Sequence, residues 1–251
     1  MSVPSPTSER PLRIAIWSGP RNISTALMRS FENRGDTFVT DEPLYACYLA
    51  ATGVDHPGRD EIVEHYETDW REVVRWLSGP VPGGKPIWYQ KQMAHHLLPE
   101  IDREWLSELA NCFLIRNPEE MLTSFIKVVP DPTLEDTGLP QQAEIFKLLS
   151  RESGQTPPVL DARDVLENPR GMLERLCAEL RVPFTEQMLS WPAGRRETDG
   201  IWAPHWYAAV ERSTGFEPYR PKEERAPERH RGLLDRCLEL YEALFAHRLQ
   251  A

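Results

Sequence analysis

Residues 12–25 read LRIAIWSGPRNIST, and this stretch decides the fold. Leu12 to Trp17 is a short apolar run that predicts a buried strand, and the next five residues are typical of a turn. Beyond the turn, Ile23, Leu27 and Phe31 recur at helical spacing, and Gly35 closes the helix. A strand that turns sharply into a helix presents free backbone N–H groups and a helix dipole, which attract phosphate. The stretch therefore predicts a phosphate-binding strand–loop–helix.

Every residue of this loop is a candidate for nucleotide binding. Gly19 permits the turn, Arg21 supplies a permanent forked cation, and hydroxyls follow in the first helical turn. The loop lacks the second Gly and the Lys of the pattern G-x-x-x-x-G-K-[ST]. Read alone, it is equally compatible with a capped helix that holds no ligand. The candidate residues are Ser18, Gly19, Pro20, Arg21, Asn22, Ile23, Ser24 and Thr25.

The rest of the chain alternates short apolar strands with helical patterns. We expect strands near 38–40, 86–91, 112–115 and 158–162, and helices over 61–77, 100–110, 118–129, 139–152 and 169–180. Such alternation predicts an α/β fold with three layers, α/β/α, around a central and mostly parallel sheet. We expect a single domain over 1–251, with residues 1–11 flexible and a closing helix within 227–250.

Composition narrows the function classes. Apolar residues make up 40% of the 251 residues, enough for a sizeable core. The formal net charge of −10 argues against general binding to nucleic acids or anionic membranes. The amino-terminal residues lack a signal-peptide core, and no window has the length of a membrane span, so we expect a cytoplasmic protein. Cys112, Cys177 and Cys237 lie in apolar patterns and are interpreted as reduced core residues.

Three downstream segments carry a family resemblance. The segment 113–118, FLIRNP, is a strand running into Arg-x-Pro, and Ser124 follows eight residues after Arg116. The segments 159–169, VLDARDVLENP, and 202–206, WAPHW, add to it. Together with the loop, these segments resemble sulfotransferases that use 3′-phosphoadenosine-5′-phosphosulfate (PAPS) as co-substrate. The resemblance covers roughly residues 12 to 220 and implies the P-loop nucleoside-triphosphate-hydrolase-like fold of that family.

The resemblance also implies roles for particular residues. Arg116 and Ser124 would hold the 3′-phosphate of the nucleotide, and the loop 18–25 would hold the 5′-phosphosulfate. Arg196 is among the nearest candidates for the basic motif near the family's carboxyl terminus. Arg21 stands where many members place Lys, and Ala26 replaces an aromatic residue, so adenine stacking must come from elsewhere; Trp17 and Trp202 are the candidates.

Sulfuryl transfer needs in-line placement, a cation near the leaving phosphate oxygen, and a base for the acceptor proton. Arg21 is the candidate cation, and Lys91 could polarise the transferring group. The family offers two precedents for the base: a His after a strand Lys, matched here by His95 or His96, and a Glu after the second strand, matched by Glu42. His205 is a further candidate for lining the acceptor pocket. The scheme requires no metal, and the sequence shows no cluster of ligand spacing.

The function predicted from the sequence is transfer of a sulfuryl group from PAPS to a hydroxyl or amine of a small molecule. Two alternatives stay open. One is a small-molecule or nucleotide kinase on the same kind of sheet, disfavoured by the missing Lys-Ser/Thr. The other is a non-catalytic nucleotide-binding protein that kept the fold. A homodimer is left open, and loop composition does not name the acceptor.

Overall fold

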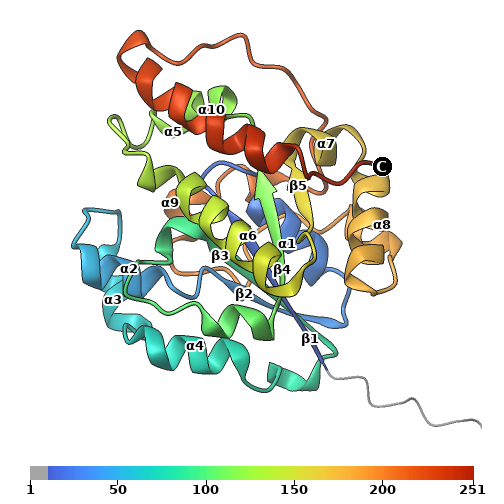
Figure 1. The fold of residues 1–251 in the computed structure, drawn as a ribbon. Coiled ribbons are helices and arrows are strands. Elements are labelled where there is room, and N and C mark those ends of the chain that lie inside the picture. The colour runs from blue at the N-terminus through green and yellow to red at the C-terminus, as the bar shows by residue number, and fades with distance from the viewer. Residues whose placement is uncertain (1–10) are drawn as a thin grey trace, which may run out of the picture.

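Five parallel strands form the centre of the fold (Figure 1). The computed structural model describes residues 11–251, so the flexibility expected for residues 1–11 falls almost wholly outside the described chain. All neighbouring strands pair in parallel, in the order β2-β3-β1-β4-β5. This confirms the predicted α/β class and its parallel sheet. The strands are β1 (Leu12–Ser18), β2 (Thr37–Asp41), β3 (Ile87–Met93), β4 (Ala110–Ile115) and β5 (Val159–Asp161).

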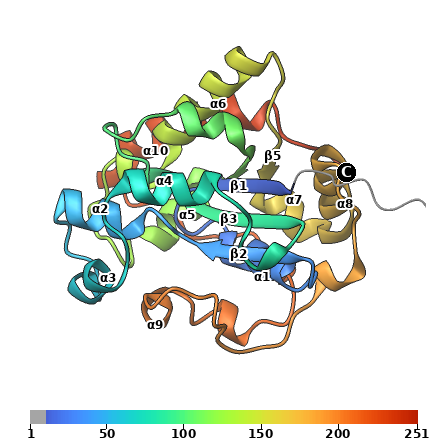
Figure 2. The same ribbon diagram turned by 90° about the horizontal axis from the view of Figure 1, so that it is seen from below.

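Helices cover both faces of this sheet. Successive strand residues point to opposite faces, so Ile14 and Ile16 pack on one side while Ala15 and Trp17 pack on the other. One face carries α1 (Ser24–Glu32), α7 (Ala162–Glu167) and α8 (Pro169–Leu180). The other carries α4 (Trp70–Ser78), α5 (Pro118–Phe125), α6 (Leu139–Ser153) and α10 (Arg231–Phe245). Figure 2 shows α6 and α10 on the side of the sheet opposite α1.

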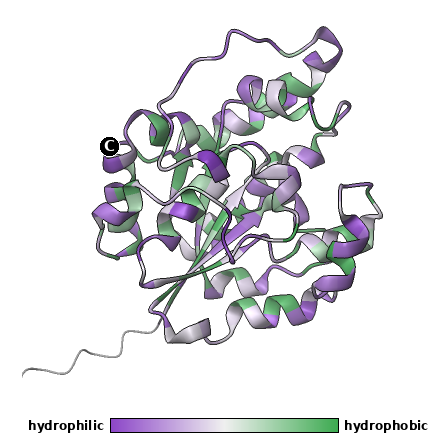
Figure 3. Ribbon diagram, turned by 180° about the vertical axis from the view of Figure 1, so that it is seen from behind, coloured by the Kyte–Doolittle hydropathy of each residue, from purple (hydrophilic) through white to green (hydrophobic). Residues whose placement is uncertain are grey.

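The hydrophobic residues follow this layering. In Figure 3 the central strands are mainly hydrophobic, whereas the outer helices alternate between hydrophobic and hydrophilic residues. A strand buried on both faces reads as a continuous apolar run, which is why 12–17 and 112–115 were recognisable from sequence. All four cysteines are free and buried, which confirms the interpretation of Cys112, Cys177 and Cys237 as reduced core residues.

A third hydrophobic cluster lies beyond the carboxyl end of β2. It joins α2 (Tyr45–Thr52), α3 (Arg59–His65) and α9 (Ala203–Trp206), which come from distant parts of the chain. Short 3₁₀ helices complete the connections: η1 (Pro82–Gly84), η2 (Ala94–His96), η3 (Glu104–Glu108), η4 (Glu135–Thr137), η5 (Glu186–Leu189), η6 (Val210–Arg212) and η7 (Glu228–His230).

Four predicted helices differ from the structure. The helix expected over 118–129 is α5, which ends at Phe125. The single helix expected over 61–77 is two helices, α3 and α4, because Asp69 accepts a hydrogen bond from the backbone N–H of Arg71 (2.9 Å) and starts a new helix there. The helix expected over 100–110 is only the 3₁₀ turn η3. The closing helix begins at Arg231 after the turn η7 and ends at Phe245, so it is shorter than 227–250.

Strand order places the carboxyl ends of β3, β1 and β4 side by side. Ser18, the last residue of β1, is in register with Met93 of β3 and Leu114 of β4. Asp41 at the end of β2 is in register with Lys91. In open α/β sheets, ligands bind outside the carboxyl ends of the strands, where the strand order reverses. Within residues 11–251, no helix is long and apolar enough to span a membrane.

Candidate functional site

The loop between β1 and α1 has a backbone suited to an anion. Arg21 (φ 62°) and Ile23 (φ 59°) adopt left-handed conformations, which are costly for residues with side chains and are frequent at functional sites. No side chain caps the first turn of α1, which starts at Ser24. The first N–H groups of a helix lack intrahelical partners, so here they remain available to a ligand. The predicted phosphate loop therefore has the geometry of an anion cradle.

Neighbouring backbone holds this loop in place. A Cβ on Gly19 would lie 2.3 Å from the carbonyl oxygen of Thr137, so the loop approaches the start of α6 as closely as only glycine permits. Asn22 Nδ2 donates to the carbonyl of Leu114 (3.2 Å). Gln142 on α6 donates to that same carbonyl (3.1 Å) and to the carbonyl of Trp17 (2.8 Å). The ends of β1 and β4 are thereby fixed to the loop and to α6.

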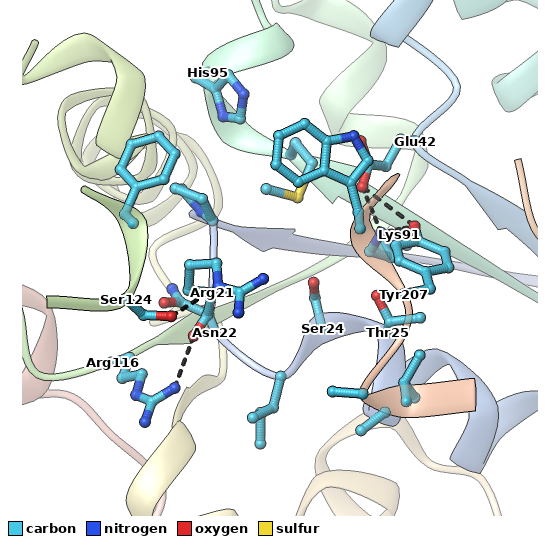
Figure 4. A pocket seen from close by; sticks show the side chains of 18 of the residues that line it. Arg21, Asn22, Ser24, Thr25, Glu42, Lys91, His95, Arg116, Ser124 and Tyr207 are labelled. Carbon is cyan, nitrogen blue, oxygen red and sulfur yellow. Dashed lines mark hydrogen bonds and ion pairs between the residues drawn. The ribbon is translucent and has the colours of Figure 1, made fainter. Parts of the chain in front are cut away.

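Basic side chains gather at one end of the loop (Figure 4). Arg21 Nε donates to Ser124 Oγ (2.9 Å), and Arg116 Nη1 donates to the carbonyl of Arg21 (2.9 Å). Burial, reinforced by the positive charge of Arg116, lowers the pKa of Arg21. Close cations that lack enough anionic partners favour a bound anion. The structure thus places Arg21, Arg116 and Ser124 close together. From the sequence, only the family resemblance had suggested that these residues act at one site.

A lysine that sequence reasoning missed completes this cluster. Lys222 Nζ donates to the backbone carbonyl of Glu120 (3.1 Å), while the carboxylate of Glu120 pairs with Arg116 (3.0 Å) and accepts from Tyr219 (2.5 Å). Burial, followed by the charge of Arg116, lowers the pKa of Lys222. Residues 220–231 carry mixed charges, which are typical of a solvated helix start, but Lys222 is partly buried and donates to Glu120. No motif in the sequence singles out Lys222, because it lies among residues of mixed charge in a long irregular stretch.

The end of β3 carries a buried charge network. Lys91 Nζ contacts Asp41 Oδ1 (2.8 Å), Glu42 Oε1 (2.5 Å) and the hydroxyl of Tyr207 (2.6 Å), and it is 1% exposed. Two carboxylates face one lysine. Burial raises the pKa of Glu42, with Lys91 opposing the effect and Asp41 adding to it. Glu42 also has a left-handed backbone (φ 40°). Tyr207 was not anticipated from sequence.

The two candidate histidines lie next to this network. Burial lowers the pKa of His95 to about 4 and lowers that of His96 well below its ordinary value. Both rings are therefore neutral at neutral pH. His96 stacks on Tyr45 (centroids 4.6 Å apart) and on Tyr48 (4.8 Å). Neither Nδ1 atom has a hydrogen-bond partner in the described chain, although both are buried.

A single cavity joins these groups. Its volume is about 410 Å³, and Figure 4 shows Arg21, Ser24, Thr25, Glu42, Lys91, His95, Arg116 and Ser124 around it. Pro20, Asn22, Ile23 and His96 line it as well. Ser18 does not: it is fully buried, and its hydroxyl is 3.5 Å from the carbonyl of Gln92. Gly19 supports the loop from behind, against Thr137.

Several sequence candidates lie away from the cavity lining. Arg196 contacts the carbonyl of Pro192 (2.7 Å) and Glu32 (3.7 Å). Trp17 is fully buried and donates to Asn111 (2.9 Å), and Trp202 is 2% exposed in the third cluster, so neither can stack on adenine. Exposed His205 is outside the lining, whereas its neighbour Trp206 belongs to it. Among the described residues, no group of three or more His, Cys, Asp and Glu side chains could hold a metal.

Comparison with known families agrees with this geometry. The model of the sulfotransferase domain family (Sulfotransfer_5) matches residues 12–248. The chain belongs to the sulfotransferase domain family. The match runs from the start of β1 to beyond the end of α10, so it includes every element that lines the cavity.

Two curated plant proteins, both from Arabidopsis thaliana, are similar to this chain. Branched-chain-amino-acid aminotransferase-like protein 2 is 39% identical over 234 residues, and protein 1 of that name is 41% identical over 232 residues. These alignments cover 93% and 92% of this chain. The sulfotransferase-family chain spans only 41% of the length of each relative.

Solved structures show the same fold. The sulfotransferase domain of the Synechococcus PCC 7002 olefin synthase superposes with a TM-score of 0.59 at 18% identity, with full coverage of both chains. A sulfotransferase from Alicyclobacillus acidocaldarius gives 0.54 at 14% identity, covering 96% of this chain and 98% of that one. The predicted sulfotransferase fold, P-loop NTPase-like in type, is confirmed. At these identities the likeness concerns the fold alone.

Proposed function

We propose that this sulfotransferase-family chain transfers a sulfuryl group from PAPS to a hydroxyl or amine of a small molecule. The observation that carries the proposal is one cavity lined at one end by Arg21, Arg116 and Ser124, and at the other by Glu42 and Lys91. The first end suits an anionic nucleotide, and the second offers a carboxylate and a cation for proton transfer and polarisation.

The residues fit a nucleotide with two separate phosphate groups. The uncapped first turn of α1, with Ser24 and Thr25, would hold the 5′-phosphosulfate, and Arg21 would neutralise charge on the leaving oxygen. Arg116, Ser124 and Lys222 would hold the 3′-phosphate, which requires Arg116 to exchange its pairing with Glu120 for the phosphate. The apolar side chains of Ile23, Leu166 and Phe216 line the cavity and would contact adenine.

Glu42 is the base in this proposal. Its raised pKa makes it a better proton acceptor than an ordinary carboxylate, whereas His95, with a pKa of about 4, is weakly basic. The PAPS that this site would bind supplies the sulfuryl group, so the acceptor oxygen forms an S–O bond as the bond from sulfur to the 5′-phosphate oxygen breaks. The acceptor proton passes to Glu42, and adenosine 3′,5′-bisphosphate leaves.

Calorimetry tests this function directly. We expect adenosine 3′,5′-bisphosphate to bind without metal and ATP with Mg²⁺ to bind more weakly. Arg116→Ala should weaken the bisphosphate on the order of 10- to 100-fold, because a hydrogen-bonded ion pair to phosphate is lost, and should barely change binding of adenosine 5′-monophosphate. Arg175→Ala, at an exposed position on α8, is the matched control.

Two results would overturn the proposal. Failure of the bisphosphate to bind would remove the sulfotransferase function, and stronger binding of ATP with Mg²⁺ would support the kinase alternative. Equal losses for the bisphosphate and the monophosphate in Arg116→Ala would contradict the 3′-phosphate site. Tight bisphosphate binding without turnover across a wide acceptor screen would favour a non-catalytic nucleotide-binding protein.

A further inference from the structure

The acceptor end of the cavity is built mainly from rings. Tyr45, Tyr48, His56 and Trp206 line it and form what we call the aromatic box. The ring centroid of His56 lies 5.9 Å from that of Tyr45, 6.1 Å from that of Tyr48 and 6.0 Å from that of Trp206. These rings come from α2, from the loop before α3 and from α9, so three separate segments converge to form the box.

Charge at this end of the cavity is negative. Asp136 lines the cavity, and its charge acts on His56, His95 and Tyr48. The nearby cation, Lys91, is already paired with both Asp41 and Glu42. Burial lowers the pKa of His56, so this ring adds no positive charge at neutral pH. An anionic acceptor would therefore meet carboxylates and no free cation among these groups.

We propose that the aromatic box binds the ammonium group of a compact amino alcohol, which is the acceptor of the reaction. An inference of this kind rests on the proposed function, because the acceptor is defined by the transfer. His96 already covers part of Tyr45 and Tyr48, and the ring surface that remains open to the cavity would attract a cation through the ring quadrupoles, with the Asp136 carboxylate adding to the attraction. The acceptor is compact because the box begins one turn from Glu42: the backbone N–H of Tyr45 donates to the carbonyl of Glu42 (3.0 Å).

The orientation of the acceptor follows from these positions. With its ammonium group against the rings and Asp136, the hydroxyl faces Glu42, which takes the hydroxyl proton as the oxygen receives the sulfuryl group. The positive charge of the acceptor would also lie across the cavity from Arg21 and Arg116, whose charges are matched by the nucleotide phosphates. The cationic acceptor and the anionic nucleotide would thereby occupy opposite ends of one cavity.

Binding of three small alcohols tests the proposal. Choline carries a quaternary ammonium, 3,3-dimethylbutan-1-ol is its neutral isostere, and 3-hydroxypropanoate is an anionic alcohol. We expect calorimetry to show choline binding at least about tenfold more tightly than the neutral isostere, with 3-hydroxypropanoate weakest. Equal or tighter binding of the neutral isostere, or tightest binding of 3-hydroxypropanoate, would overturn the inference.

Substitutions test whether the preference for choline over its neutral isostere depends on the aromatic box and on Asp136. Asp136→Asn should weaken choline about five- to tenfold and leave the neutral isostere within about twofold. Because Asp136 also accepts from the backbone N–H of Thr133 (2.8 Å), Trp206→Leu provides a second variant with the same expected selectivity. Asp235→Asn, at an exposed position on α10, is the control. Unchanged choline binding in both Asp136→Asn and Trp206→Leu would also overturn the inference.

Titration of adenosine 3′,5′-bisphosphate into the same preparations separates the two proposals. Bisphosphate binding without a preference for choline would overturn the ammonium site and keep the proposed function. Choline binding at the box without bisphosphate binding would remove the proposed function and leave an ammonium-binding cavity.

Discussion

Glu42 is held in an unusual setting. Its backbone is left-handed, its carboxylate contacts Lys91, and burial raises its pKa. A carboxylate in this state can accept a proton near neutral pH more readily than a solvated one. His95 faces the same cavity but has a depressed pKa. The two residues therefore differ in basicity, and kinetics can separate their contributions.

We expect Glu42→Gln to reduce kcat by about 10²- to 10⁴-fold, the range for loss of a general base. Binding of adenosine 3′,5′-bisphosphate should change less than about twofold, because Glu42 belongs to the acceptor end. His95→Gln should reduce kcat by less than about tenfold. Turnover of labelled PAPS with an acceptor found by screening is the measurement, and Glu61→Gln, exposed on α3, is the control. A larger loss in His95→Gln than in Glu42→Gln would make the histidine the base.

His95 also predicts a pH dependence of stability. Its pKa is about 4 in the folded protein and about 6.5 when unfolded, so between these values the unfolded chain binds more protons. The free energy of unfolding therefore falls as pH decreases from 6.5 towards 4. Between pH 7.5 and pH 5 the wild-type protein should lose about 2 kcal/mol more than His95→Gln.

Urea unfolding at the two pH values measures this difference. Asp161, whose pKa burial raises to about 6, acts in the opposite direction, but it is present in both proteins and cancels in the comparison. Parallel pH dependence in wild type and His95→Gln would show that the pKa of His95 is not lowered in the folded protein.

At the scale of elements, the β1–α1 loop is held in place by its contact with the start of α6. Gly19 and Gly138 touch: a Cβ on Gly138 would lie 3.3 Å from Gly19 Cα. The turn η4 is packed against the loop through the Thr137 carbonyl. The closest atom to a Cβ on Gly19 is a backbone oxygen, which cannot move aside as the end of a flexible side chain can. The loop position is therefore coupled to α6.

Gly19→Ala should disturb this coupling. The added methyl meets the Thr137 carbonyl oxygen at 2.3 Å, so backbone must shift, at a cost of about 1–3 kcal/mol in the free energy of unfolding. Affinity for adenosine 3′,5′-bisphosphate should fall as well. Gly232→Ala in α10 meets nothing within 4 Å and should keep or slightly raise stability. Wild-type stability and affinity in Gly19→Ala, measured by urea unfolding and calorimetry, would argue against the coupling.

At the scale of the whole molecule, the sequence predicted the layered arrangement of helices and strands more accurately than the residues at which each helix begins and ends. The strand–loop–helix at 12–31 was readable because a doubly buried strand is a continuous apolar run and because the following helix has clear spacing. The break between α3 and α4 was missed because it depends on one capping aspartate, Asp69, within an otherwise helical pattern. A helix-capping residue and a continuous helical pattern predict different structures for the same segment, and the packing of the folded chain decides which one forms.

Sequence could predict only those residues of the candidate site that lie near strand ends. Arg21 and Arg116 follow strand ends, and Ser124 lies on α5, the helix after β4. Strand ends in a parallel sheet share one edge, so the proximity of these residues could be anticipated. Three further residues lie near the site although they are distant from it in sequence: Lys222, Tyr207 and Gln142. No local sequence pattern predicts contacts of this kind. Trp17 failed as an adenine contact because alternation along β1 turns it into the core, against Trp105.

The cavity is lined by residues that lie far apart in the sequence. Residues 20–26 line one part of the cavity, and several residues between 206 and 217 line another. On the ribosome the amino-terminal residues emerge first, so the nascent chain carries the phosphate loop long before the segment that closes the cavity has been made. A nucleotide in the cell therefore cannot assist the early steps of folding by binding a finished cavity. If the proposed function holds, stabilisation by PAPS or its product would become available only after the cavity walls have been synthesised, and it would act on the lifetime of the folded protein.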